Sequence, residues 1–186
     1  DMALWAKDIT TPPHKILASG ANSSFPNNNH ETYDTMSVIW EIGDYQITWQ
    51  HTAGIQNGPW NKPYGIEFIG DLGTIVVDRS GYKVIPQWDD QTKKGKIEPE
   101  ESDKGGENHQ EHAQNFIDSV RSRQKPVCIP EIGRAVAVAA HCANIAVRSG
   151  ENFLIWDETN GKFSNSEKAN QYIVPEYRKP WALPKV

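Results

Sequence analysis

Two histidines three residues apart are the first residues here whose type and spacing could do chemistry. His109 and His112 fall at the start of a predicted helix, where an i, i+3 spacing places both imidazoles on one side. Such a pair can flank a substrate, transfer a proton or bind a metal ion. The pair is also compatible with a solvated first turn and the rim of an apolar stripe. Both residues are candidates for substrate binding, and we predict no metal site.

His51 and Trp60 form a second pair of substrate-binding candidates. His51 ends a predicted strand, and Trp60 lies among polar residues in the Gly-, Pro- and Asn-rich loop that follows. An imidazole at a strand end beside an aromatic-bearing loop can line a pocket, and it can equally stabilise a turn. His141 lies beside the apolar stripe of a long helical pattern, so we expect a hydrogen-bonded core histidine there.

The sequence contains no recognisable catalytic or cofactor-binding motif. It has no G-x-G-x-x-G after a strand, no G-x-x-x-x-G-K-[ST], no G-x-S-x-G and no H-E-x-x-H. We therefore predict no catalytic and no cofactor-binding residue in this chain. Cys128 and Cys142 have no second cysteine pair beside them, which favours buried, reduced thiols, with a structural disulfide as the alternative, over a zinc site. Four carboxylates stand alone, without an assignable acid–base partner: Asp34, Asp71, Asp78 and Glu131.

Length and charge exclude several classes of protein. The 186 residues fit one domain, and the formal net charge is −5. The densest basic patch, residues 93–96, is flanked by acidic residues, so we expect no nucleic-acid partner. No apolar run approaches the ~20 residues that span a bilayer, so we expect no membrane partner. The compartment stays open between the cytoplasm, which we favour, and the periplasm.

The first half of the chain is predicted to form short strands. Period-two patterns cover residues 36–42 and 45–50 around a Gly-Asp turn, which predicts a hairpin. Further strands are expected at 15–20, 64–70, 74–78 and 82–86. Short turns between most of them predict one antiparallel meander of about six or more strands.

The second half reads as helices. Residues 89–108 are charged and contain glycine, which predicts a mobile connection. A 3.6-residue period then predicts one helix from about 108 to before Pro126 and a longer one over 130–150. A strand at 153–156, a short helix at 164–172 and an extended tail at 175–186 follow. The fold class is therefore α+β: an open, mainly antiparallel mixed sheet covered on one face by two long helices.

The other face of that sheet is expected to be partly apolar. Ile39 stands beside Trp40, so the strand carries apolar side chains on both faces. Sheet faces of this kind usually meet another protein surface, and we predict self-association through this face rather than exposure to solvent.

Several segments resemble the Gfo/Idh/MocA oxidoreductase family, named after glucose–fructose oxidoreductase and inositol dehydrogenase. They are YGIEFIGDLGTIVVD (Tyr64–Asp78), the run from His112 to Gly150, and the closing run from Leu154 to Trp181. The opening DMALWA is similar to the helix that ends the family's active-site motif. The resemblance covers nearly the whole chain, with the motifs in one order.

The resemblance implies a two-domain parent protein. Residues 1–186 would be its single C-terminal domain for substrate binding and oligomerisation, with 1–7 the end of a truncated helix. A missing N-terminal Rossmann domain would bind NAD or NADP and would be this domain's partner. The family's catalytic Lys and His would also lie outside this chain. His112 matches the family's His-x-x-Asn-Phe helix start and His51 its Trp-x-His strand, so both carry over as candidate substrate-pocket residues.

The implied reaction is the reversible oxidation of a sugar or polyol hydroxyl by a pyridine nucleotide. On this interpretation the chain alone is inactive and binds no cofactor. The alternative is a stand-alone, sheet-based module that binds carbohydrate or protein without a redox parent.

Overall fold

The computed structural model describes residues 1–106 and 108–182. The chain divides into two compact units. Unit 2 is Ile55–Val127, and unit 1 combines Asp1–Gly54 with the described chain from Cys128 onward. Helices and antiparallel sheets both occur, which confirms the α+β class with open sheets.

Unit 1 is built on a five-stranded antiparallel sheet in the order β11-β10-β1-β2-β3. Its strands are β1 (Lys15–Ala21), β2 (Thr35–Ile42), β3 (Tyr45–Thr52), β10 (Phe153–Asp157) and β11 (Lys162–Phe163). The predicted hairpin is present, with Ile42 opposite Tyr45 across the Gly43-Asp44 turn.

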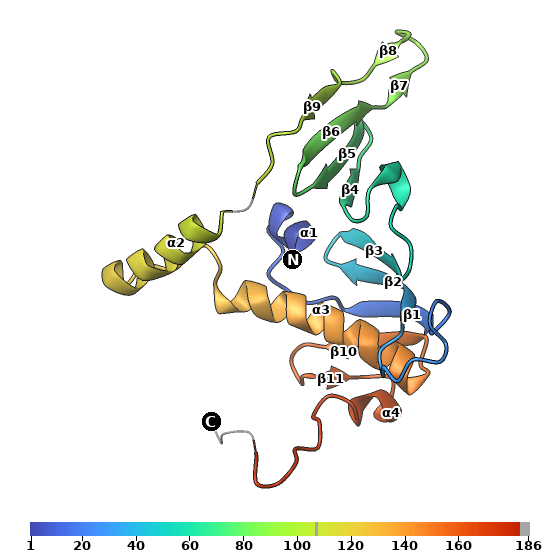
Figure 1. Ribbon diagram of the computed structural model, residues 1–186, viewed down its shortest axis with the longest axis vertical. Helices are drawn as coiled ribbons and strands as arrows, with labels where there is room; N and C mark the ends of the chain where they lie inside the picture. The colour runs from blue at the N-terminus through green and yellow to red at the C-terminus, as the bar shows by residue number, and fades with distance from the viewer. Residues whose placement is uncertain (107, 183–186) are drawn as a thin grey trace. The chain divides into compact units, whose positions relative to one another are not determined.

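Helix α3 (Pro130–Ser149) packs on one face of this sheet and contacts β1 and β10 (Figure 1). Its buried residues are mostly small, so the helix can approach the strands closely. Gly150 ends it in a left-handed conformation at φ 72°, where glycine carries no Cβ penalty. The core between the two layers is Ile16, Ala18, Met36, Val38, Cys142, Ala143, Ala146, Val147, Leu154, Phe163 and Ala169.

Two short helices complete unit 1. In α1 (Met2–Ala6), Leu4 is buried in a second small cluster with Ile42 and Ala135. Helix α4 (Glu167–Asn170) is capped by the Ser166 side chain, which accepts a hydrogen bond from the Ala169 amide.

Unit 2 contains a separate four-stranded antiparallel sheet in the order β4-β5-β6-β9. The strands are β4 (Ile66–Ile69), β5 (Gly73–Asp78), β6 (Gly81–Pro86) and β9 (Glu100–Ser102), with a small ribbon of β7 (Trp88–Asp89) and β8 (Lys94–Gly95). A 3-10 turn, η1 (Pro59–Asn61), precedes β4, and helix α2 (His109–Ser122) follows β9.

The structure corrects the predicted arrangement in three places. The strands form a five-stranded sheet, a four-stranded sheet and a two-stranded ribbon rather than one meander, because the loop between β3 and β4 interrupts the ladder. The predicted mobile connection over 89–108 contains strands β8 and β9. β9 pairs with β6 so closely that a Cβ at Gly81 would lie 1.8 Å from the Ser102 carbonyl oxygen. Helix α2 belongs to unit 2 and has no buried residue, and within unit 1 the long helix that covers the sheet is α3.

Of three further single-residue predictions, the structure confirms one and contradicts two. Cys142 is buried as expected, and burial raises its pKa to about 12, whereas Cys128 is exposed. His141 is exposed, because it lies on the side of α3 that faces away from the sheet.

Within the described residues, no helix is long and apolar enough to cross a membrane.

We predict that Leu154→Ala will be strongly destabilising. Leu154 is fully buried between the sheet and α3, so truncation leaves a cavity and should cost about 2–5 kcal/mol of unfolding free energy. Leu17→Ala is the matched control, because Leu17 on the adjacent strand points to the open face and is 40% exposed. It should cost less than about 1 kcal/mol. Urea denaturation of the two variants checks the difference, and equal losses would contradict the assignment of faces.

Candidate functional site

The structure distributes the four sequence-predicted site residues over both units. His51 lies near the end of β3 in unit 1, whereas Trp60 lies in η1 of unit 2. His109 and His112 both lie in the first turn of α2 and are exposed. Each group is therefore described within its own unit.

His51 is held by hydrogen bonds at both ring nitrogens. The Trp49 indole Nε1–H donates to His51 Nδ1 at 2.9 Å, and His51 Nε2 lies 3.1 Å from the Tyr33 carbonyl oxygen. Because a carbonyl can only accept, Nε2 must carry the proton and Nδ1 must be the acceptor. This arrangement fixes a neutral tautomer, so His51 positions its neighbours rather than offering a free base.

Trp49 is the residue that this arrangement orients. Its ring stands edge-on to that of His51, with centroids 6.1 Å apart at 68°. The Trp49 side chain is still 50% exposed, so its indole is fixed in direction yet open to solvent. We call Tyr33, Trp49 and His51 the Trp49 cluster. Sequence reasoning missed Trp49, although Trp-x-His in a strand places both rings on one face.

A buried carboxylate organises the loop that carries Tyr33. Asp34 is 8% exposed and accepts hydrogen bonds from the Ser23, Ser24 and Phe25 amides at 2.9, 3.2 and 2.7 Å. The Thr35 hydroxyl donates to it at 2.9 Å. Its own backbone carbonyl accepts from the Ala53 amide, which follows β3. Asp34 thus joins the 22–34 loop to the end of the strand that carries the Trp49 cluster.

The pKa of Asp34 reflects two opposing effects. Burial raises the pKa of the carboxyl, but the backbone amides and the Thr35 hydroxyl favour the charged form. The net result is a pKa below the ordinary value for aspartate. In the sequence Asp34 stands as an isolated carboxylate, because its donors are backbone amides that leave no side-chain pattern.

In unit 2, Trp60 is attached to the sheet by a hydrogen bond. Its indole Nε1–H donates to Glu67 Oε1 at 2.5 Å, and its side chain is 53% exposed. Nearby, Lys62 Nζ donates to Asp78 Oδ2 at 2.5 Å, and the Ser80 amide and hydroxyl donate to the other oxygen. The Lys62 hydrogen bond is the main cause that lowers the pKa of Asp78 well below its usual range.

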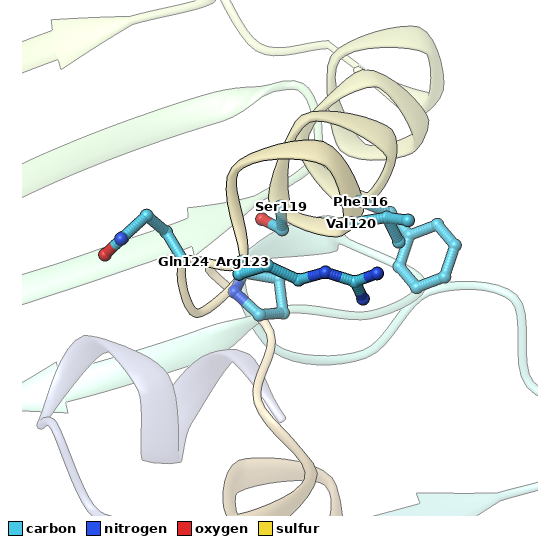
Figure 2. A pocket seen from close by; sticks show the side chains of 6 residues that line it. Phe116, Ser119, Val120, Arg123 and Gln124 are labelled. Atoms are coloured by element: carbon cyan, nitrogen blue, oxygen red, sulfur yellow. The ribbon is translucent and has the colours of Figure 1, made fainter.

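The surface of α2 contains a shallow apolar hollow at the end away from its histidines. Phe116, Ser119, Val120, Arg123, Gln124 and Pro126 line it. Figure 2 shows the Arg123 and Gln124 side chains extending in opposite directions from the last turn. Phe116 is 61% exposed and Val120 47%, so the apolar stripe of α2 is uncovered within the described structure.

The described residues include no group of three or more His, Cys, Asp or Glu side chains that could hold a metal ion. Of the clusters in unit 1, the Trp49 cluster combines an oriented, open aromatic ring with a polar loop beside it. Such an arrangement can bind a ligand that has both an apolar face and hydrogen-bonding groups. It is the best candidate for a binding site in unit 1.

Comparison with known proteins gives a fold relationship. No protein-family description matches the chain, and no curated protein sequence matches it significantly. A solved structure, described as a putative oxidoreductase from Klebsiella pneumoniae, is similar with a TM-score of 0.55 at 10% sequence identity. The likeness covers 92% of this chain and 49% of the other. This chain therefore spans about half the length of the oxidoreductase whose fold it shares.

We predict that Asp34→Asn will change the acid dependence of stability. A carboxyl whose pKa is lower in the folded than in the unfolded protein stabilises the fold above its unfolded pKa of about 4. That contribution is lost as the pH falls from about 4 toward the folded pKa. The variant should melt on the order of 5 °C lower at neutral pH, with a smaller further loss in acid. Melting temperatures recorded against pH test this, and parallel curves for both proteins would contradict it.

We also predict that His51→Ala will release the Trp49 indole. Loss of the acceptor should move the Trp49 indole N–H resonance upfield and speed its exchange with water. Loss of this partly exposed hydrogen bond should cost roughly 0.5–1.5 kcal/mol of unfolding free energy. Two-dimensional nitrogen–proton spectra measure the effect, and Trp49→Phe assigns the signal. An unchanged indole resonance would show that His51 does not hold Trp49.

Proposed function

We propose that this chain is the substrate-side domain of an NAD(P)-dependent oxidoreductase of the Gfo/Idh/MocA type. The parent protein would oxidise a hydroxyl of a sugar or polyol, with NAD or NADP bound by an N-terminal Rossmann domain. The observation that carries the proposal is the fold likeness, which spans 92% of this chain and about half of the oxidoreductase structure. The segment resemblances from Tyr64 to Trp181 support it independently.

The glycine pair before α2 does not fit a dinucleotide cradle, which supports placing the cofactor elsewhere. A dinucleotide cradle needs a glycine turn that opens between a strand and a helix. The glycine pair before α2 includes Gly105, whose Cβ would lie 2.0 Å from the Arg79 carbonyl oxygen and whose amide donates to Ser80. Gly105 is therefore needed for packing against a turn.

The Trp49 cluster supports a substrate-binding role for unit 1. Sugars and polyols present C–H groups that can stack on an aromatic face and hydroxyls that need hydrogen-bonding partners. The indole of Trp49 is half exposed and oriented by His51, so it offers such a face. His51 would act through Trp49, as a positioning residue. Trp60, His109 and His112 remain substrate-binding candidates contributed by unit 2.

The open face of the unit 1 sheet supports an oligomer interface. The strand register places Phe153, Leu17 and Ile39 in one row across three strands on the face away from α3. Phe153 is 42% and Leu17 40% exposed. An apolar row of this kind is typical of a surface that contacts another protein.

The second candidate is a sheet-based module that binds carbohydrate without redox chemistry. The oriented, half-exposed Trp49 favours it, because that ring could bind a sugar with no cofactor present. The two candidates differ in what the complete protein does with a pyridine nucleotide.

Our functional prediction uses the complete gene product beside this chain. We expect calorimetric titration with NAD, NADH, NADP and NADPH to show binding by the complete protein and none by this chain alone. The complete protein should also reduce its nucleotide in the presence of a sugar or polyol from a panel. Substitution of Trp49 by Ala should raise KM more than it lowers kcat, because Trp49 lies in the proposed binding surface. Micromolar nucleotide affinity of this chain, or none in the complete protein, would overturn the proposal.

A further inference from the structure

Within unit 1, strand β3 leaves one long edge of the five-stranded sheet without a partner strand. It is the last strand in the order β11-β10-β1-β2-β3, and all eight of its residues pair one to one with β2 on the other side. Six of the eight are exposed. A one-to-one register means that no bulge twists this edge away from a potential partner.

The chain protects its other sheet edges but not this one. β11 is two residues long, β9 contains Glu100 and Glu101, and β4 carries Glu67. β3 has no charged residue and no proline over Tyr45–Thr52. Short length, charge and proline are the usual means by which proteins prevent edge pairing, and β3 has none of them. A bare edge of this length is a template for another strand.

Alternate residues of β3 direct their backbone groups toward this edge. The two-residue turn makes Ile42 and Tyr45 a hydrogen-bonded pair, so odd-numbered residues bond to β2. The hydrogen bond from the Ala53 amide to the Asp34 carbonyl agrees with this alternation. The N–H and C=O groups that face outward therefore belong to Gln46, Thr48, Gln50 and Thr52.

The pattern of these outward residues is symmetric. Gln46 and Gln50 lie at equal distances on either side of Thr48, and all three side chains are uncharged. An interface between two identical strands related by a two-fold axis needs this kind of self-complementarity. Residues opposite each other in a sheet point to the same face, whereas successive residues of one strand point to opposite faces. The two-fold axis between two copies of β3 must therefore lie at a residue position and not midway between two successive residues.

We propose that two copies of this chain pair β3 against β3 in antiparallel fashion, with the two-fold axis at Thr48. Gln46 of each copy then lies opposite Gln50 of the other, and Thr48 faces its own equivalent. Each of these pairs exchanges two backbone hydrogen bonds. The two five-stranded sheets become one continuous sheet, and each α3 lies on the same face.

The side chains fit this register. On the α3 face, Ile47 of one copy comes beside Trp49 of the other, which is an apolar–aromatic pair of the stabilising kind. The nearest charged residue before the strand, Asp44, falls opposite Thr52 and meets no like charge. Thr48 lies opposite Ile39 in the register, so its side chain is on the open face beside the row of Leu17, Ile39 and Phe153. The β3 pairing differs from an interface on that face because it uses the backbone groups of the edge.

The test is the oligomeric state of the full chain and its edge variants, measured by light scattering and sedimentation over a concentration range. The wild type should form dimers. Thr48→Lys and Thr48→Glu should each weaken dimerisation roughly tenfold or more, because two like charges meet at the axis. Mixing these two variants should restore a dimer that contains one copy of each, because unlike charges then meet at the axis.

A proline variant and a face variant separate this edge from other surfaces. Thr48→Pro removes an outward amide and should give a monomer whose circular dichroism matches the wild type. Leu17→Asp, on the open face, should leave the β3 dimer intact. A wild-type protein that is monomeric at all concentrations would overturn the proposal. This holds even if the Thr48 amide of the monomer exchanges slowly with water. A dimer that Leu17→Asp dissociates would also overturn it, in favour of the sheet face. If Thr48→Pro unfolds, the mixing experiment and Leu17→Asp decide together.

Discussion

The close approach of α3 to the unit 1 sheet is the constraint on which the rest of this unit depends. Alanines at positions 135, 139, 143 and 146 form the helix surface that meets the strands, and each is buried. Because these side chains are small, the larger residues of the sheet fill the space between the layers. The Trp40 indole adds a hydrogen bond to the Ala139 carbonyl at 3.1 Å, which links β2 to the helix across that core.

This packing determines which parts of unit 1 are free to bind. One face of the sheet is used by α3, so the opposite face keeps its apolar row exposed. The contacts of α3 with the sheet are mainly with β1 and β10, and Trp49 on β3 is half exposed although the register places it on the same face as buried Val38. The hydrogen bonds of His51 and Asp34 then fix the loop and the indole where packing no longer does.

The sequence predicted the elements of the fold better than their partners. The Gly43-Asp44 hairpin, the 3.6-residue period of α3 and the α+β class follow from local pattern, and the structure contains them. The division into separate sheets does not follow, because a period of two identifies a strand and its faces without identifying its neighbour. The apolar stripe of α2 predicted a buried face, but α2 has no buried residue. The reason is similar, because an amphipathic helix buries its apolar face only where a partner surface exists.

Residue positions within elements show the same limit. His141 lies six residues after Ala135, which at about 100° per residue places it on the side of α3 opposite the buried alanines. A helical projection predicts this position, whereas its place beside the apolar stripe suggested a core residue. Asp34 could not have been found in this way, since its partners are the backbone amides of Ser23, Ser24 and Phe25 in an irregular loop. Only the folded loop brings those amides to one carboxylate.

Because the proposed binding surface and the proposed β3 pairing share one strand, they constrain each other. Neighbouring side chains on a sheet stand side by side, so Ile47 of a second copy would cover the edge of the Trp49 indole rather than its outward face. His51 already occupies the other side of that ring. Pairing would thus restrict the indole further while leaving a face open to a ligand. A ligand that binds this face would then stabilise the paired state, and assembly and binding would be thermodynamically linked through Trp49.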